Sequence, residues 1–301
     1  MGKRWSLGWL LLFGIITVLP SLNEAGELPP SAVARVATPV FSDPSFPKLF
    51  GGKSGKTLQS DRCGQLRSLE FIAPPGSLFT VIGAVPGSAP PVWRVTTAEY
   101  PYPARKGYFV DPRFLIPATA QSPQRLRSLP AEEEILSRLR SSVGAPYVWG
   151  GNVRNGIPEL LKLYPPATPL PVAAGAAWSL AGLDCSGLLY EATDGFTPRN
   201  TSSLIGYGIP VPLAGKDPRA IVALLKPLDL IVWNGHVMIV LDNGEVIQSR
   251  LQCGAPGNGG VILQPLLGSL TQLMKVRRGV DLYPPPPEKD KKLFVVRRWY
   301  P

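Results

Sequence analysis

The sequence has little of the residue types that bind metals or nucleic acids. Its 301 residues include one histidine and three cysteines. This scattered set has no zinc-site spacing, so neither a metal nor another cofactor is expected. The net charge is +10, but basic residues form only short pieces such as KVRR and VVRR, without the aromatic-interleaved basic stripe of nucleic-acid-binding proteins. The dispersed charge favours peripheral association with a polyanionic matrix or membrane surface, or simply solubility.

Charged residues are scarce as well, at 17%, while hydrophobic residues make up 45%. This balance is typical of an ordered globular protein rather than of a disordered one. The 35 prolines and 31 glycines indicate that loops and short strands outweigh long helices. A chain of this length has room for two domains, each with its own core.

The N-terminus has the charge-then-apolar order of a secretory signal. Lys3 and Arg4 precede an apolar run over 9–19 that is too short to span a bilayer. We expect a signal peptide over 1–25, cleaved after Ala25, and an exported protein of the periplasm or cell envelope. Asn23 fits the small-residue rule for cleavage poorly, so retention as a membrane anchor is the alternative.

Export changes the interpretation of the cysteines. An oxidising compartment tends to pair thiols or to leave one of them reactive. Cys63 and Cys253 are able to pair and leave Cys185 alone, but two independent buried thiols explain the sequence equally well.

Two kinds of pattern divide the chain. Residues 26–120 contain short β-rich runs between Pro, Gly and Ser turns, which predicts a small all-β barrel. In 121–301, PAEEEILSRLRSS predicts a helix with acids in its first turn and arginines in its last. The later runs DLIVWNG, HVMIVL and EVIQSRL predict antiparallel strands. Helix first and strands after is the α+β order.

The stretch GLDCSGLLY, at 182–190, is the first candidate for chemistry. Asp184 is suited to cap a helix that begins at Cys185. A thiol at a helix N-terminus lies at the positive end of the dipole, which favours the thiolate. Alone, however, a cysteine is more often a small buried side chain.

A cysteine nucleophile needs a histidine, and His236 opens a strand directly after the turn WNG. The next strand offers Gln248 or Ser249 to orient the imidazole. A two-residue hairpin loop would put Ser249 on the same face as His236. A three-residue loop with Gly244 left-handed puts Met238 opposite Gln248, which becomes the diagonal neighbour of His236. We choose Gln248 because its longer side chain bridges that diagonal.

In this order, PYVWGG, DCSGL, GHVMIV and VIQS resemble the NlpC-type cell-wall cysteine peptidases, which have a papain-like core. The resemblance covers 125–283, and the strands over 26–120 resemble a bacterial SH3-like domain. It implies an α+β protein in which a small SH3-like barrel precedes a papain-like catalytic domain over 121–301. The implied partners are the stem peptides of peptidoglycan.

The resemblance also implies an activity and a set of roles. The protein would hydrolyse the bond between the side-chain carboxyl of D-glutamate and a diamino acid such as diaminopimelate. Cys185 would attack the carbonyl, His236 would act as base and then acid, and Gln248 would hold the imidazole. The backbone N–H of Cys185 and the side chain of Tyr147 would stabilise the oxyanion.

Relatives with the string DCS bind the free amine of a terminal L-alanine through the acid and the hydroxyl that flank the cysteine. Asp184 and Ser186 match these positions, although Asp184 serves equally well as a helix cap alone. A tyrosine of the SH3-like domain often completes the pocket. The candidates are Tyr100, Tyr102 and Tyr108.

The sequence departs from the family in two places. Gln248 stands where the family usually has a second histidine, and a long Pro-rich insertion occupies 152–181, either roofing the cleft or making a surface excursion.

Alternatives for the activity are an amidase that cuts muramoyl-L-alanine, an acyltransferase with the same thioester chemistry, and a catalytically silent wall-binding scaffold.

Overall fold

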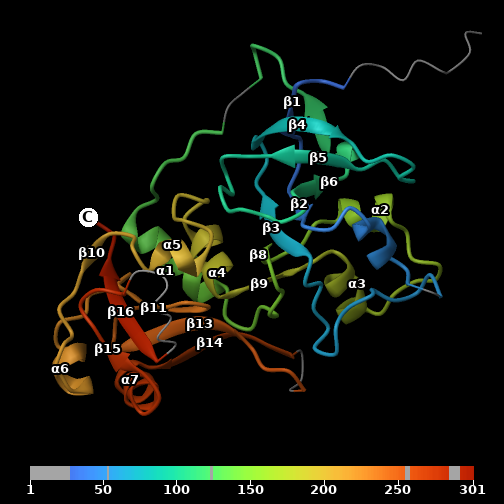
Figure 1. The fold of residues 1–301 in the computed structure, drawn as a ribbon. Helices are drawn as coiled ribbons and strands as arrows, with labels where there is room; N and C mark the ends of the chain where they lie inside the picture. Colours follow the sequence, from blue (N-terminus) through green and yellow to red (C-terminus); the bar gives the residue numbers. More distant parts are fainter. Residues whose placement is uncertain (1–27, 53, 123–124, 255–257, 285–291) are drawn as a thin grey trace, which may run out of the picture.

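The computed structural model describes residues 28–301 except for residue 53 and the ranges 123–124, 255–257 and 285–291. The expected signal peptide over 1–25 lies outside the described residues. The chain mixes helices with two large sheets, one made by its first third and one by its last (Figure 1). No helix in the described part is long and apolar enough to cross a membrane.

The first sheet is antiparallel and has seven strands in the order β3-β2-β6-β5-β4-β1-β7. Its strands and two 3₁₀ helices are β1 (Ser31–Ala34), β2 (Thr38–Phe41), η1 (Phe46–Leu49), β3 (Leu69–Ala73), β4 (Leu78–Ala84), β5 (Trp93–Thr96), β6 (Tyr108–Val110), η2 (Pro112–Phe114) and β7 (Leu115–Pro117). The short β-rich runs expected from the sequence are therefore strands. Phe41, Phe71 and Phe79 are fully buried and divide between two buried clusters, one that contains Phe41 and one that contains Phe71 and Phe79.

The second sheet follows the order β10-β16-β11-β12-β13-β14, with β15 parallel to β16. Its strands are β10 (Ile209–Pro210), β11 (Leu230–Trp233), β12 (His236–Val240), β13 (Glu245–Leu251), β14 (Gly259–Pro265), β15 (Arg278–Gly279) and β16 (Leu293–Arg298). The three strands expected from the sequence correspond to β11, β12 and β13. They pair antiparallel, as expected.

Helices cover both faces of this sheet. They are α1 (Glu132–Ser141), α4 (Cys185–Ala192), α5 (Thr201–Leu204), α6 (Pro218–Val222) and α7 (Leu266–Met274). Val237 and Ile239 pack with α1 and α4, whereas Met238 and Val240 pack with α6 and α7. This alternation along β12 follows the two-residue period of a strand and seats α4 firmly against one face.

The Pro-rich insertion over 152–181 packs against the first sheet. It contains β8 (Asn152–Val153), α2 (Glu159–Leu163) and α3 (Val172–Trp178), and it leads to β9 (Gly182–Leu183). Leu160 and Tyr164 share a buried cluster with Phe41 and Phe114. The surface-excursion interpretation therefore holds for 165–177, where no residue is buried, whereas burial of the apolar side chains before and after this stretch anchors the segment. None of its residues lines the pocket at Cys185 described below, so among the described residues it does not roof that pocket.

Direct bonds join the first sheet to the rest of the chain. Asn152 bonds the backbone of Ile72 twice, accepting from its N–H at 2.9 Å and donating to its carbonyl at 2.8 Å. Cys63 and Cys253 form a disulfide, and Cys185 is the free cysteine. Of the two interpretations of these cysteines, the structure has the paired one.

We expect the disulfide to contribute strongly to stability, because it closes a loop with a sequence separation of 190 residues. Loop-closure entropy predicts a loss of about 2–5 kcal/mol in the free energy of unfolding for Cys63→Ser/Cys253→Ser. Urea unfolding without reductant measures this loss, with the unmutated chain in dithiothreitol as a matched control. Equal urea midpoints for the double variant and the oxidised chain would contradict the prediction.

Candidate active site

Cys185 is the first residue of α4, and the cap of that helix is the one expected. The side chain of Asp184 accepts a hydrogen bond from the N–H of Gly187 at 2.6 Å. The helix start also lies against the loop that carries the PYVWGG motif. A Cβ at Gly187 would collide with the carbonyl oxygen of Gly151, so only glycine permits this approach.

The thiol of Cys185 is buried next to the start of β12. Its side chain is 7% exposed, and Sγ lies 4.0 Å from the carbonyl oxygen of Gly235, the residue before His236. Burial raises the pKa of Cys185 to about 12, with a further increase from Asp184, against smaller opposing effects of Arg199 and backbone N–H groups. Desolvation and the Asp184 carboxylate therefore oppose the thiolate that the helix N-terminus favours.

His236 is held by the glutamine expected from the sequence. Ile239 pairs with Ile247 and Val240 with Val246, which is the register of the expected three-residue loop. His236 Nε2 lies 2.7 Å from Gln248 Oε1. Because an amide oxygen only accepts, Nε2 carries the proton and Nδ1 keeps its lone pair. The alternative partner, Ser249, instead donates to the carbonyl oxygen of Leu183 at 2.6 Å.

A second glutamine, which the sequence analysis did not single out, extends this chain of hydrogen bonds. Gln248 donates through Nε2 to Oε1 of Gln264 at 2.5 Å. Gln264 lies on β14, so it fixes which end of the Gln248 amide faces the imidazole. Burial lowers the pKa of His236, and Arg250 and Arg277 lower it further, while the bond to Gln248 raises it. The imidazole is therefore neutral near pH 7 and has the tautomer of a base.

We expect Gln248→Ala to lower kcat by about tenfold to a hundredfold, because a hydrogen bond to a charged group contributes about 1.5–3 kcal/mol. Removing a bond that raises the pKa of His236 also moves the acid limb of the pH–rate profile further below the ordinary histidine value of 6.5. A pH–rate profile measures both effects, and Gln248→His is the conservative control. An unchanged kcat and an unchanged acid limb in Gln248→Ala would show that Gln248 does not position the imidazole.

A pocket of about 310 Å³ opens at Cys185; we call it the thiol-side pocket. Its lining includes Tyr147, Asp184, Ser186, Asn200, Glu70 and Tyr100. The last two come from the first sheet and its loops. Of the three candidate tyrosines, Tyr100 therefore reaches this pocket. Tyr102 instead donates to Ser203 Oγ at 2.9 Å, and Tyr108 donates to the carbonyl oxygen of Tyr102.

Tyr147 lines the pocket from the PYVWGG loop. Burial raises the pKa of its hydroxyl, and the negative charges of Asp184 and of the Cys185 thiolate would raise it further. The hydroxyl therefore stays protonated and able to donate. Gln65 holds the loop in place, donating to the carbonyl oxygen of Tyr147 at 3.3 Å and accepting from the N–H of Trp149 at 2.8 Å.

A buried arginine that the sequence analysis did not anticipate bonds two residues of the pocket lining. Arg199 is 2% exposed and donates to both carboxylate oxygens of Asp184, at 2.9 and 2.7 Å. It also donates to Ser186 Oγ at 3.0 Å. Asp184 and Ser186 thus line the pocket as expected, but an internal cation already engages both. No spacing signal marks Arg199 in the polar segment after α4.

Glu70 is the carboxylate of the pocket that has no cationic partner among the described residues. It is partly buried on β3 and accepts from the Tyr100 hydroxyl at 3.2 Å. Asn200 donates to the same hydroxyl at 2.9 Å. The arrangement leaves a negative group facing the pocket, which suits a ligand ammonium.

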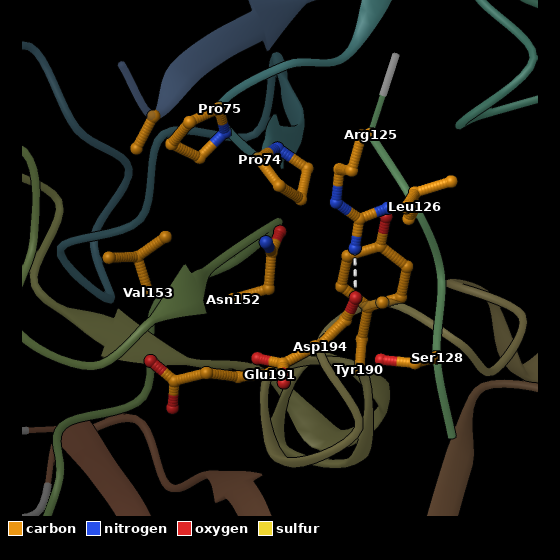
Figure 2. A pocket seen from close by; sticks show the side chains of 12 residues that line it. Pro74, Pro75, Arg125, Leu126, Ser128, Asn152, Val153, Tyr190, Glu191 and Asp194 are labelled. Carbon is orange, nitrogen blue, oxygen red and sulfur yellow. Dashed lines mark hydrogen bonds between the residues drawn. The ribbon is translucent and has the colours of Figure 1, made fainter. Parts of the chain in front are cut away.

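Another cavity, of about 430 Å³, lies near the opposite end of α4 (Figure 2). Pro74, Pro75 and Arg125 face Tyr190 and Glu191 across it, and Arg125 donates to the carbonyl oxygen of Asp194. The part of its lining that the structure describes has neither cysteine nor histidine. The nucleophile and base expected from the sequence are therefore not in this cavity.

No protein-family model matches the sequence, and the curated proteins include no match. Solved structures that resemble the chain include an NlpC/P60 family protein from Bacillus cereus, 16% identical over 90% of this chain and 100% of that one, with a TM-score of 0.49. The peptidoglycan hydrolase RipB from Mycobacterium tuberculosis is 26% identical over 44% of this chain and 61% of that one, with a TM-score of 0.28. NlpC1 from Trichomonas vaginalis is 14% identical over 92% of this chain and 71% of that one, with a TM-score of 0.31. The chain is thus similar to proteins described as members of the NlpC/P60 family.

Proposed function

We propose that this protein is an exported cysteine endopeptidase that hydrolyses the γ-D-glutamyl–diamino acid bond of peptidoglycan stem peptides. The observation that carries the proposal is a buried thiol at a helix N-terminus, against the residue that precedes His236, and an imidazole whose Nδ1 is free to accept a proton. The Sγ of Cys185 lies against Gly235, and His236 is held by Gln248. This arrangement supports the roles of nucleophile for Cys185, base for His236 and orienting group for Gln248.

The resting pair is neutral, so the thiol loses its proton as it attacks. Sγ forms a bond to the substrate carbonyl carbon while its proton moves to Nδ1 of His236. The resulting oxyanion accepts hydrogen bonds from the N–H of Cys185 and the hydroxyl of Tyr147. When the C–N bond breaks, the imidazolium returns the proton to the leaving amine. Water, deprotonated by the same imidazole, then hydrolyses the thioester.

The thiol-side pocket supports a preference for a stem with a free N-terminal L-alanine. An ammonium placed there meets the Glu70 carboxylate and the Tyr100 hydroxyl. Arg199 neutralises much of the charge of Asp184, so in this proposal Asp184 and Ser186 shape the pocket and supply remaining acceptor sites. Glu70 is the principal partner of the amine.

The rest of the chain has roles consistent with this activity. We assign 1–25 to a signal peptide, 26–120 to an SH3-like domain that contributes to the substrate pocket, and 121–301 to the catalytic domain. The Cys63–Cys253 disulfide supports a place in the periplasm or cell envelope, because such bonds persist in oxidising compartments. The net charge of +10 supports association with an anionic surface there.

Product analysis tests the proposal. We expect mass spectrometry to find L-Ala-γ-D-Glu after incubation with L-Ala-γ-D-Glu-diaminopimelate, and much less product from the N-acetylated tripeptide. Release of intact stem peptides from the sugar of whole peptidoglycan would identify the amidase instead. Binding to peptidoglycan without any hydrolysis would identify the silent scaffold.

A further inference from the structure

A second cavity borders the site on the side of the imidazole, and its volume is about 590 Å³. We call it the imidazole-side cavity. Its lining includes Trp233, His236, Gln248, Arg250, Gln264 and Ser269. The strands β11 to β14 and the first turns of α7 form its walls. It is therefore continuous with the proposed base and its orienting group, but Cys185 is not among its lining residues.

The charge of this cavity is positive. Arg250 is exposed, lies two residues after Gln248 on β13, and forms no ion pair among the residues that the structure describes. The guanidinium of Arg277 lies 4.7 Å from the centroid of the Trp233 ring. Both arginines lower the pKa of His236, which indicates that their charge acts at the cavity. The described lining contains neither Asp nor Glu.

The imidazole-side cavity also contains a hydroxyl group that lacks a hydrogen-bond partner among the described residues. Ser269 Oγ is buried and has no hydrogen-bond partner among the described residues, and Ser269 lines the cavity. Buried hydroxyls normally have partners, because an unmade hydrogen bond costs about 1–3 kcal/mol. A ligand acceptor within the cavity would give this hydroxyl a partner.

The proposed reaction decides which half of the substrate lies on this side. The imidazole of His236 must reach the nitrogen of the leaving amine to return the proton. The acyl half lies on the other side, where Cys185 and Glu70 line the thiol-side pocket. The leaving half consequently extends past His236 into the imidazole-side cavity.

We propose that the imidazole-side cavity is the subsite for the leaving amine and that Arg250 recognises a carboxylate carried by that amine. The inference rests on the proposed function and adds residues and a selectivity to it. The ligand class is an amino acid amine with a free carboxylate near the scissile nitrogen. A guanidinium binds a carboxylate through charge-assisted hydrogen bonds, which a carboxamide cannot replace. Stems with amidated diamino acids are therefore poor substrates.

The test compares L-Ala-γ-D-Glu-diaminopimelate with the same tripeptide amidated at its diaminopimelate carboxyls. The unmutated chain should prefer the free acid by about tenfold to a hundredfold in kcat/KM, the value of one charge-assisted hydrogen bond. Arg250→Gln should reduce this preference to less than about threefold. Arg219→Gln, an exposed arginine on α6, is the matched control and should keep the preference.

Equal hydrolysis of acid and amide by the unmutated chain, or an unchanged preference in Arg250→Gln, would overturn the inference while leaving the proposed function in place. Hydrolysis of neither tripeptide would count against the proposed function instead. A binding measurement then decides about the cavity: saturation-transfer NMR of diaminopimelate with Cys185→Ala and with Cys185→Ala/Arg250→Gln. Binding of diaminopimelate to Cys185→Ala that is lost in Cys185→Ala/Arg250→Gln supports the subsite. Equal binding to both variants, or binding to neither, overturns it.

Discussion

We expect Cys185→Ala to lower hydrolysis of L-Ala-γ-D-Glu-diaminopimelate by at least about 10⁴-fold, because removing the nucleophile of such a site removes nearly all of its rate enhancement. The variant stays folded, since the change deletes one sulfur atom from a helix start that Asp184 still caps. Progress curves by liquid chromatography measure the loss. Circular dichroism and peptidoglycan binding should match those of the unmutated chain.

The disulfide variant Cys63→Ser/Cys253→Ser is the matched control for loss of a cysteine. It keeps the free thiol, so below its unfolding transition it should retain hydrolysis even though its stability falls. A Cys185→Ala protein that cleaves the tripeptide at a rate within tenfold of the unmutated chain would show that the thiol only packs.

We expect Arg199→Met to destabilise the protein by about 3–5 kcal/mol, the cost of leaving one partner of a buried ion pair uncompensated. The arginine side chain is 1% exposed and the Asp184 side chain 13% exposed, so little water replaces the lost guanidinium. Ser186 and the carbonyl oxygen of Gly151 lose a donor as well. Urea unfolding measures the loss in the free energy of unfolding.

Arg138→Met is the matched control, because the Arg138 ion pairs with Glu134 and Asp194 are largely exposed. Surface pairs contribute about 0–1 kcal/mol, so this variant should change stability little. The double variant Asp184→Asn/Arg199→Met should recover part of the loss, because no buried charge is left unpaired. If Arg199→Met were as stable as Arg138→Met, the buried pair would not anchor the start of α4.

Local sequence patterns were sufficient to predict the helix that begins at Cys185 and the strand that begins at His236. Asp184 caps α4 because capping depends on residues within one helical turn. The contact between His236 and Gln248 follows from the hairpin loop, in which Gly244 has a φ of 72° and the register puts Gln248 on the diagonal. Turn chemistry and the strand period fix both arrangements locally.

Contacts between segments that are distant in the sequence could not be predicted from such local patterns. Glu70 comes from the first sheet, and Arg199 comes from a polar segment after α4; neither has a spacing that relates it to Cys185. The packing of the insertion on the first sheet is a tertiary contact of the same kind. Burial of the thiol, which raises the pKa of Cys185, also depends on the whole fold and has no signal in the local sequence.

The most direct test of the central claim is a search for the covalent intermediate on Cys185. The unmutated chain is mixed with excess L-Ala-γ-D-Glu-diaminopimelate, quenched in acid during the first turnovers, digested and mapped by mass spectrometry. The account predicts an L-Ala-γ-D-Glu acyl group on the peptide that contains Cys185, joined through a thioester that hydroxylamine releases. Product formation with Cys185 unmodified, continuing undiminished in Cys185→Ala, would contradict it.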